Sequence, residues 1–461
     1  MNSSSKPSST RPSSGGKGRS RVNYADKRRK SKPASAARRA IVMMMEEVIG
    51  RGHPLQDALN ASKEWGQLDQ RDRRFARRLI TILLRHRGDA RHVLKRYLSK
   101  PLSRRDKKAE AILLLAVVEL IWADGDRHAA VDQAVRLMRG EGFSHLTGLA
   151  NAVLRRVAAD IDAILAEPPT PLRNAPGWLV SALEADWGPD AEAVMASLLM
   201  PPPLDLRVKT DPAGWAKRLQ GVALPHGSVR LTDGMVTALD GYDDGDWWVQ
   251  DAAASLPAML LEGAFTDGLK GKTVVDLCEL CAAGATVLAV DTSADRLKIL
   301  TENMTRLKLS PEVITADGMA WSPDQKVDAV LLDAPCSATG TIRRRPDILS
   351  HNSPPDLGHL NSLQRGLLEA ALSWLKPGGV LVYATCSILK AEGEAMVASL
   401  PDGAQDLPVT DAELHGFAAT ASGRGVRVMP DALQVEADDL DTTRIIPQGN
   451  DGFFMARFVK S

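Results

Sequence analysis

The sequence predicts an all-α N-terminal domain followed by an α/β domain built on an open parallel sheet. From residue 36 to 167, apolar side chains recur at three- and four-residue spacing, as in amphipathic helices. From about residue 246, short β-branched runs alternate with helical stretches, which is typical of strand–helix–strand units. The runs predicted as buried strands are 272–277, 286–290, 313–316, 327–332 and 380–383, and the helical stretches between them include 293–307 and 361–374.

Composition and the positions of turn-forming residues divide the chain into four segments. Residues 1–35 form a basic tail rich in Ser, Pro and Gly, which we expect to be disordered. Residues 36–167 form the helical domain, 168–245 a linker and connecting region, and 246–461 the α/β domain. Residues 1–39 contain 12 Lys and Arg but one acidic residue, Asp26. The tail either contacts nucleic-acid phosphates or only keeps the protein soluble.

The overall composition is that of a globular protein, with 461 residues, 44% hydrophobic, 25% charged and a net charge of +1. Four cysteines in this length do not suggest a disulfide scaffold, so we expect a reducing compartment. No apolar run reaches the roughly 18 residues of a membrane-spanning helix. The polar start of the chain lacks the apolar core of a secretory signal. A cytoplasmic protein is therefore expected.

Two cysteines follow apolar runs near the end of the chain. Cys336 lies in the sequence LDAPCSATG, after the run 327–332, and Cys386 lies in KPGGVLVYATCS, after the run 380–383. Each is predicted at the carboxyl end of a buried strand, the edge where open α/β sheets bind their ligands. Free cysteine can also act as a small core residue. Here each is flanked by Ser and by Pro or Thr, which favours a loop facing a shared cleft.

A thiol in such a cleft can activate a pyrimidine ring. Addition of a thiolate to C6 of cytosine makes C5 nucleophilic enough to take a methyl group, after which C5 loses a proton and the thiol is expelled. The thiolate requires a polar or electropositive setting. Asp333, three residues before Cys336, could bond the edge of the base.

The stretches DAPCSATGTIRRRPD and KPGGVLVYATCS resemble the fourth and sixth motifs of the RNA 5-methylcytosine methyltransferases. The resemblance covers residues 246–461 and implies a Rossmann-like methyltransferase domain that uses S-adenosyl-L-methionine. It also implies that Cys386 is the nucleophile, that Cys336 assists product release, and that Asp333 orients the base. Cys386 in its Thr-Cys-Ser context favours this RNA type, because the DNA enzymes use the Pro-Cys thiol as nucleophile.

The helical segment resembles the NusB-like domain that precedes one branch of this family. The matching pieces are 68–75 (LDQRDRRF), 130–135 (AVDQAV) and 150–156 (ANAVLRR). They point to the RsmB type, which modifies 16S rRNA, so small-subunit ribosomal RNA is the expected partner, with no membrane and no stable protein partner inferred. The segment also carries basic residues that could face RNA or simply be solvated: Arg74, Arg77, Arg78, Arg85 and Arg87.

Carboxylates follow successive predicted strands of the α/β domain. By resemblance, Asp291 binds the ribose hydroxyls of the cofactor, Asp317 the adenine side, and Asp333 lies between cofactor and base, with Cys278 at the first strand end. Any one such carboxylate could instead cap a helix. Three in the expected order favour the cofactor interpretation.

The chain departs from the family after the first strand. Family members carry a loop there that reads roughly Asp-x-Cys-Ala-Ala-Pro-Gly-Gly-Lys-Thr, whereas this chain runs from Asp276 to Asp291 in 15 residues, about eight fewer. A parallel crossover needs roughly 10–12 residues or more. We therefore expect a distorted connection between the first two strands and weak or absent cofactor binding. The pair Cys278 and Cys281 is not expected to bind metal, because no second pair lies nearby.

Two alternatives remain open at this point. The chain could be an RNA-binding homologue without catalysis, because the cofactor loop is absent. It could also be a methyltransferase that acts on an amino group, a reaction that needs no thiol. Arg343, Arg344 and Arg345, just after the Cys336 motif, either neutralise RNA phosphates or form a solvated run.

Overall fold

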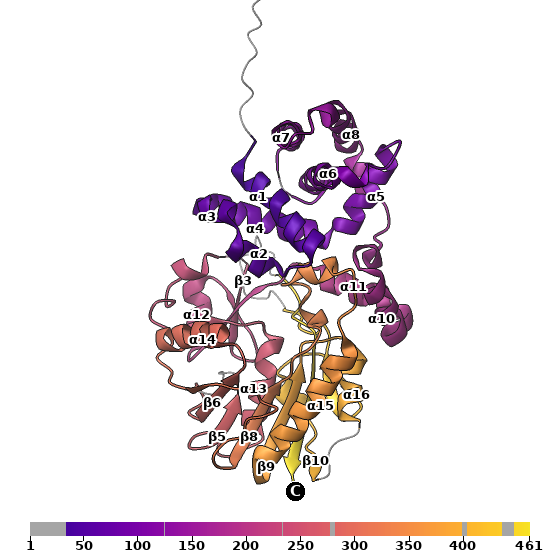
Figure 1. Cartoon of the computed structure of the whole chain (residues 1–461). Helices are drawn as coiled ribbons and strands as arrows, with labels where there is room; N and C mark the ends of the chain where they lie inside the picture. The colour runs from indigo at the N-terminus through magenta and orange to yellow at the C-terminus, as the bar shows by residue number, and fades with distance from the viewer. Residues whose placement is uncertain (1–33, 124, 233, 277–281, 399–402, 436–446) are drawn as a thin grey trace, which may run out of the picture.

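The computed structural model describes residues 34–123, 125–232, 234–276, 282–398, 403–435 and 447–461 (Figure 1). The predicted disordered tail lies outside these residues, except for positions 34 and 35. Figure 1 places the N-terminal helices above a large sheet, with a smaller sheet between them. Among the described residues, no helix combines the length and the apolar character needed to cross a membrane.

The N-terminal domain is helical, as predicted. Its core surrounds α6, in which Leu113, Val117 and Val118 are almost completely buried. Asp69 caps α4, because its side chain accepts a 2.8 Å hydrogen bond from the backbone N–H of Asp72. The α-helices are α1 (Ala36–Met45), α2 (Leu55–Ala61), α3 (Lys63–Gln67), α4 (Gln70–Arg85), α5 (Arg87–Tyr97), α6 (Lys107–Ile121), α7 (Arg127–Gly140), α8 (Thr147–Ala159) and α9 (Ile161–Leu165), with a π-helical turn, Glu46–Gly50, after α1.

The described part of the connecting region contains three α-helices and a small antiparallel sheet of order β2-β3-β1-β4. Strand β4 pairs with β1, so the segment predicted as the α/β domain, 246–461, begins with a strand of this small sheet. Asp205 on β1 and Arg230 on β3 form a fully buried ion pair, with N–O distances of 2.7 and 2.8 Å. The elements are α10 (Gly177–Trp187), α11 (Ala191–Leu199), β1 (Leu204–Val208), α12 (Pro212–Leu219), β2 (Val222–Ala223), β3 (Ser228–Leu231) and β4 (Trp247–Val249).

The C-terminal domain is a mixed, Rossmann-like sheet of order β11-β12-β13-β9-β8-β5-β6-β7, and β10 pairs with β13. The strands β5 to β9 run parallel, and β13 lies antiparallel beside β9. Its elements are α13 (Leu256–Gly263), β5 (Thr273–Asp276), β6 (Thr286–Asp291), α14 (Ala294–Arg306), β7 (Glu312–Thr315), β8 (Val327–Asp333), α15 (Leu357–Trp374), β9 (Leu375–Thr385), α16 (Glu394–Val397), β10 (Ala404–Asp406), β11 (Ala419–Ser422), β12 (Gly425–Val428) and β13 (Phe453–Lys460).

Both faces of the parallel sheet are buried. Successive side chains of a strand point to opposite faces, so β9 serves two cores. Val380 and Val382 belong to the cluster that includes α13, whereas Leu381 and Tyr383 belong to the cluster that includes α15. A strand buried on both sides holds its carboxyl end firmly, which is the condition for placing a reactive side chain there.

The short connection does not prevent β5 and β6 from pairing. They are parallel neighbours, with Val274 opposite Val287 and Asp276 opposite Ala289. Residues 282–284 of the connection form a turn, and its earlier residues, 277–281, lie outside the described residues. The described part of the link therefore contains no helix.

The helical domain docks on the loop that follows Cys336. Arg85 donates a 2.8 Å hydrogen bond to the carbonyl of Arg343, and Arg87 donates one of 3.2 Å to that of Leu349. Burial lowers the pKa of Arg85 to about 10, with a further contribution from Arg343, and burial likewise lowers the pKa of Arg87 to about 10. The interpretation of these two arginines as RNA-facing is therefore wrong: both are buried between domains.

Candidate active site at the ends of β8 and β9

The two predicted cysteines meet at the carboxyl edge of the sheet. The Sγ atoms of Cys336 and Cys386 lie 3.5 Å apart, and both residues are partly buried. Their loops are held by the parallel pairing of β8 with β9, which continues as a 2.9 Å hydrogen bond from the N–H of Ala334 to the carbonyl of Ala384. A second bond of 2.9 Å joins the N–H of Gly340 to the carbonyl of Cys386.

A buried carboxylate that the sequence interpretation missed fastens the two loops together. Glu392 is fully buried and accepts hydrogen bonds from the N–H of Ser337, at 2.8 Å, and from the hydroxyl of Ser387, at 2.7 Å. Gln364 of α15 donates to the same carboxylate at 3.2 Å. Ser337 and Ser387 are the residues directly after the two cysteines. Glu392 therefore positions both thiols through the residues that follow them. In the sequence, the only indication of this role is that Glu392 lies six residues after Cys386.

The electrostatics favour the protonated form of the Cys336 thiol. The pKa of Cys336 is raised well above its ordinary value by its hydrogen bond to Cys386, by burial, and by the charges of Cys386 and Glu392. Cys336 therefore remains a protonated thiol that is able to donate to Cys386. The Cys336 S–H is thus available as a hydrogen-bond donor to the sulfur of Cys386.

Arg344 supplies positive charge to the same place. Burial lowers the pKa of its guanidinium, but the charges of Asp451, Asp251 and Cys386 together raise that pKa above its ordinary value. Arg344 donates a 2.6 Å hydrogen bond to Asp451. This arrangement is the electropositive setting that a reactive thiolate requires.

The expectation that the three consecutive arginines share one role is wrong for Arg343. Arg343 is buried and donates to backbone carbonyls from three parts of the chain. These acceptors are the carbonyls of Met200, Pro201, Pro430, Gln448 and Asn450, at 2.5–3.3 Å. Arg345 is exposed, and its contact with RNA phosphates stays a prediction.

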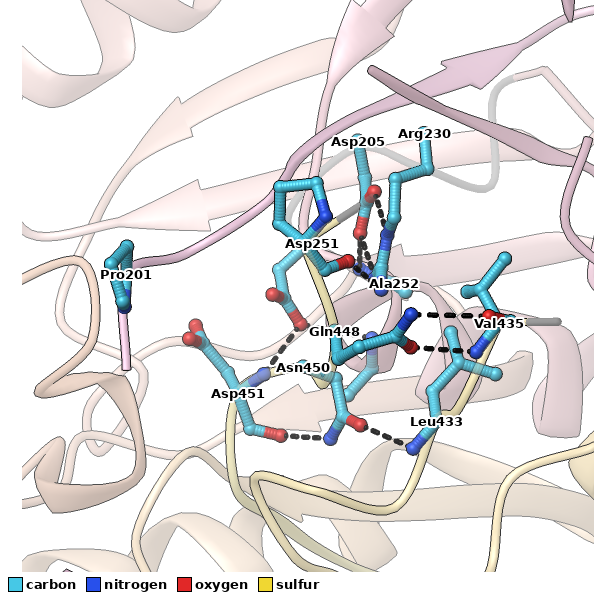
Figure 2. Close-up of polar contacts among 12 residues, drawn as sticks. Pro201, Asp205, Arg230, Asp251, Ala252, Leu433, Val435, Gln448, Asn450 and Asp451 are labelled. Carbon is cyan, nitrogen blue, oxygen red and sulfur yellow. Dashed lines mark hydrogen bonds and ion pairs between the residues drawn. The ribbon is translucent and has the colours of Figure 1, made fainter. Parts of the chain in front are cut away.

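The segment 447–451 ties this charge cluster to the small sheet. Figure 2 shows the N–H of Asp451 donating to Asp251, at 3.0 Å, beside the Asp205–Arg230 pair. Asn450 accepts from the N–H of Leu433 at 2.9 Å. Burial, and then the charge of Asp251, raise the pKa of Asp451 to about 7, against the opposing effect of Arg344. The small sheet thus positions Asp451, which in turn holds Arg344 near Cys386.

The predicted cofactor carboxylates lie along the same edge. Asp291 ends β6, Asp333 ends β8, and Asp317 follows β7 by two residues. Asp291 pairs with Arg296 at 2.9 Å and accepts from the N–H of Ser293 at 2.7 Å, while Asp317 accepts from the N–H of Met319 at 2.9 Å.

Asp291 and Asp317 follow the adjacent strands β6 and β7, whereas β5 lies between β6 and β8, the strand that ends at Asp333. Cys278, the remaining cofactor prediction, lies outside the described residues. The part of the chain that the structure describes contains no group of His, Cys, Asp and Glu arranged to hold a metal ion.

Comparisons with known proteins identify the family. Residues 268–459 match a family model described as 16S rRNA methyltransferase RsmB/F, and residues 35–159 match the NusB family. A Ribosomal RNA small subunit methyltransferase B from Xylella fastidiosa is 32% identical over 441 residues, which cover 90% of this chain and 95% of that protein. The chain belongs to the RsmB/F family. The namesake from Xanthomonas campestris is 34% identical over 390 residues, covering 78% of this chain and 86% of its own length.

A solved structure supports the fold of this RsmB/F member. The crystal structure of PH0851 superposes with a TM-score of 0.65 at 21% identity, covering 93% of this chain and all of that one. At this identity the likeness shows the fold alone. The predicted family and the predicted fold class, a NusB-like helical domain followed by a Rossmann-like methyltransferase domain, are confirmed.

Proposed function

We propose that this RsmB/F member transfers a methyl group from S-adenosyl-L-methionine to C5 of a cytosine in 16S rRNA, with Cys386 as the nucleophile. The observation that carries the proposal is the 3.5 Å approach of the Cys336 and Cys386 Sγ atoms at the ends of β8 and β9. A methyltransferase acting on an amino group has no use for two adjacent thiols, so the pair favours chemistry at carbon.

The proposed reaction assigns a task to each side chain. The Cys386 thiolate, facing Arg344 and the Cys336 S–H, forms an S–C6 bond with the cytosine. Asp333, at the end of β8, orients the base, and C5 becomes nucleophilic enough to accept a methyl group. A base then removes the proton from C5 and the S–C6 bond breaks. Cys336, protonated and in contact with Cys386, assists this release by donating a hydrogen bond to the departing thiolate, so that Cys386 leaves in the ionised form in which it attacked.

The cofactor supplies the electrophilic methyl group when it is bound. We propose that Asp291 binds its ribose hydroxyls, that Asp317 lies on the adenine side, and that Asp333 separates it from the base. Cys278 and the methionine end of the cofactor belong to the shortened connection after β5. Because that connection is short, we propose that cofactor binding is weaker than micromolar, and isothermal titration with S-adenosyl-L-methionine measures it.

Unmodified small-subunit RNA and methyl-labelled cofactor at millimolar concentration test the main proposal. Wild-type protein should transfer label to cytosine C5. The Cys386→Ala variant should lose transfer by on the order of a thousandfold or more while binding the same RNA with unchanged affinity. Label transfer by the variant at the wild-type rate would contradict the role of Cys386.

A second candidate function is RNA binding without catalysis. The short β5–β6 connection favours it, since that connection should hold one end of the cofactor. Under this alternative the protein binds small-subunit RNA, but no label is transferred even at saturating cofactor. The same experiment therefore separates the two functions.

A further inference from the structure

A pocket between the helical domain and the Cys336 loop belongs to neither the thiol pair nor the cofactor edge. It has a volume of about 450 Å³, within the roughly 300–1,000 Å³ usual for ligand pockets. Three parts of the chain line it: the turn after α1, with Arg51; α10, with Trp178; and residues of the segment from Ser337 to Pro355. Because Ser337 directly follows Cys336, the pocket opens beside the candidate active site.

The pocket is lined by two aromatic side chains, Trp178 and His351, and two buried polar atoms without partners lie in its wall. Trp178 donates a 2.8 Å hydrogen bond from Nε1 to the backbone carbonyl of His351, which fixes the indole ring beside that residue. The Oγ of Ser350 and the Nε2 of His351 are buried and have no hydrogen-bond partner among the described residues. Ser350 as a whole is 1% exposed. Unsatisfied buried groups of this kind are uncommon in a protein interior.

A basic groove continues from this pocket across the helical domain. The groove, of about 490 Å³, shares Ile49, Gly50 and Asn352 with the pocket. Apart from the interdomain Arg87, four cationic side chains line it against two acidic ones, Glu46 and Glu110: Arg91, Arg105, Lys107 and Lys108. Arg91 pairs with Glu110 and Lys108 with Glu141. Arg105 and Lys107 are exposed and form no ion pair within the described part of the chain.

We propose that the pocket binds an unpaired nucleobase neighbouring the target cytosine, and that the basic groove binds the phosphates of the same RNA strand. Base stacking on aromatic side chains, combined with a cationic track for the backbone, is how proteins bind single-stranded RNA. This inference rests on the proposed function for the identity of the strand. It adds a binding site to which the helical domain contributes directly, beside the thiols.

Fluorescence anisotropy with a labelled twelve-nucleotide oligoadenylate, without cofactor, tests the site. This probe contains no cytosine, so its binding does not depend on methyl transfer. The Arg105→Ala/Lys107→Ala variant should bind about tenfold more weakly, with the slope of log K against log salt reduced in magnitude by between about one and two. The matched control, Arg127→Ala/Arg139→Ala, removes two exposed arginines of α7 that line neither the pocket nor the basic groove. It should bind nearly as wild type does.

The pocket is tested separately from the groove. His351→Ala should weaken binding by about fivefold or more, because it removes a stacking surface, while leaving the salt slope unchanged. Trp178→Phe, which retains a ring, should bind more tightly than Trp178→Leu at equal thermal stability. The site is refuted if the pocket and groove variants bind as wild type does, or if the α7 control loses as much affinity as the groove variant. Failure of the labelled-methyl experiment with intact oligoadenylate binding would refute the proposed function alone.

Discussion

The carboxyl edge of the parallel sheet has two unlike halves. At the ends of β8 and β9, the thiols lie 3.5 Å apart and buried Glu392 bonds the residues after both. Beyond the carboxyl end of β5, nine residues, 277–285, lead back to the start of its parallel neighbour β6, and their described part, 282–285, contains no helix. One sheet can therefore keep its reactive side chains in register while an adjacent connection changes length, because strand pairing fixes each end separately.

The largest effect is expected from lengthening the short connection between β5 and β6. Insertion of Ala-Ala-Pro-Gly-Gly-Lys-Thr after Cys278 should increase the affinity for S-adenosyl-L-methionine by at least tenfold, because the glycines let the backbone approach the cofactor. Isothermal titration of both chains measures the change. An inserted poly-Ser segment of the same length is the control and should give no gain. Micromolar binding by the unaltered chain would mean that the short connection is no handicap.

The second prediction concerns the loops that carry the two thiols after β8 and β9. Glu392→Gln keeps the shape of the side chain but removes the charge that bonds Ser337 and Ser387, so both loops should move. We expect methyl transfer to fall about tenfold, unfolding free energy to fall by about 1–3 kcal/mol, and cofactor affinity to stay the same. Labelled-methyl assays, urea unfolding and titration measure the three quantities. A fall in cofactor affinity equal to the loss in rate would show that the two halves are not independent.

The smallest expected effect concerns pH. Because the pKa of Asp451 is raised from 3.8 to about 7 in the folded protein, the folded state binds a proton between those values that the unfolded state has lost. Its contribution to stability is therefore present below about pH 4 and is lost as the pH rises to about 7. The Asp451→Asn variant should lack this decline. Urea unfolding of both proteins at pH 5 and pH 8 measures it, and parallel pH dependences would contradict the assignment.

The sequence predicted much of the fold because its patterns were local. The helical domain and the strands β5 to β9 were expected within a few residues, and both cysteines were placed correctly at the ends of β8 and β9. The small sheet was not foreseen, because β2 has two residues and β4 has three, too few for a periodic pattern.

Contacts between distant segments were beyond the reach of such patterns. Arg85 and Arg87 were expected to face RNA, yet a basic helix face has the same sequence whether it is solvated or docked on another domain. Arg343 and Glu392 depend on partners brought together only by the fold. The roles of Asp291, Asp317, Asp333 and Cys278 stay predictions.

The central claim is that Cys386 bonds to the base and Cys336 helps it leave. Intact-mass analysis of the Cys336→Ala protein, after incubation with unmodified small-subunit RNA and S-adenosyl-L-methionine and digestion of the RNA, tests this directly. The account predicts a covalent nucleotide adduct that accumulates in Cys336→Ala and is absent from Cys336→Ala/Cys386→Ala. An adduct in the double variant, or methyl transfer by Cys336→Ala with no adduct at any time, would contradict it.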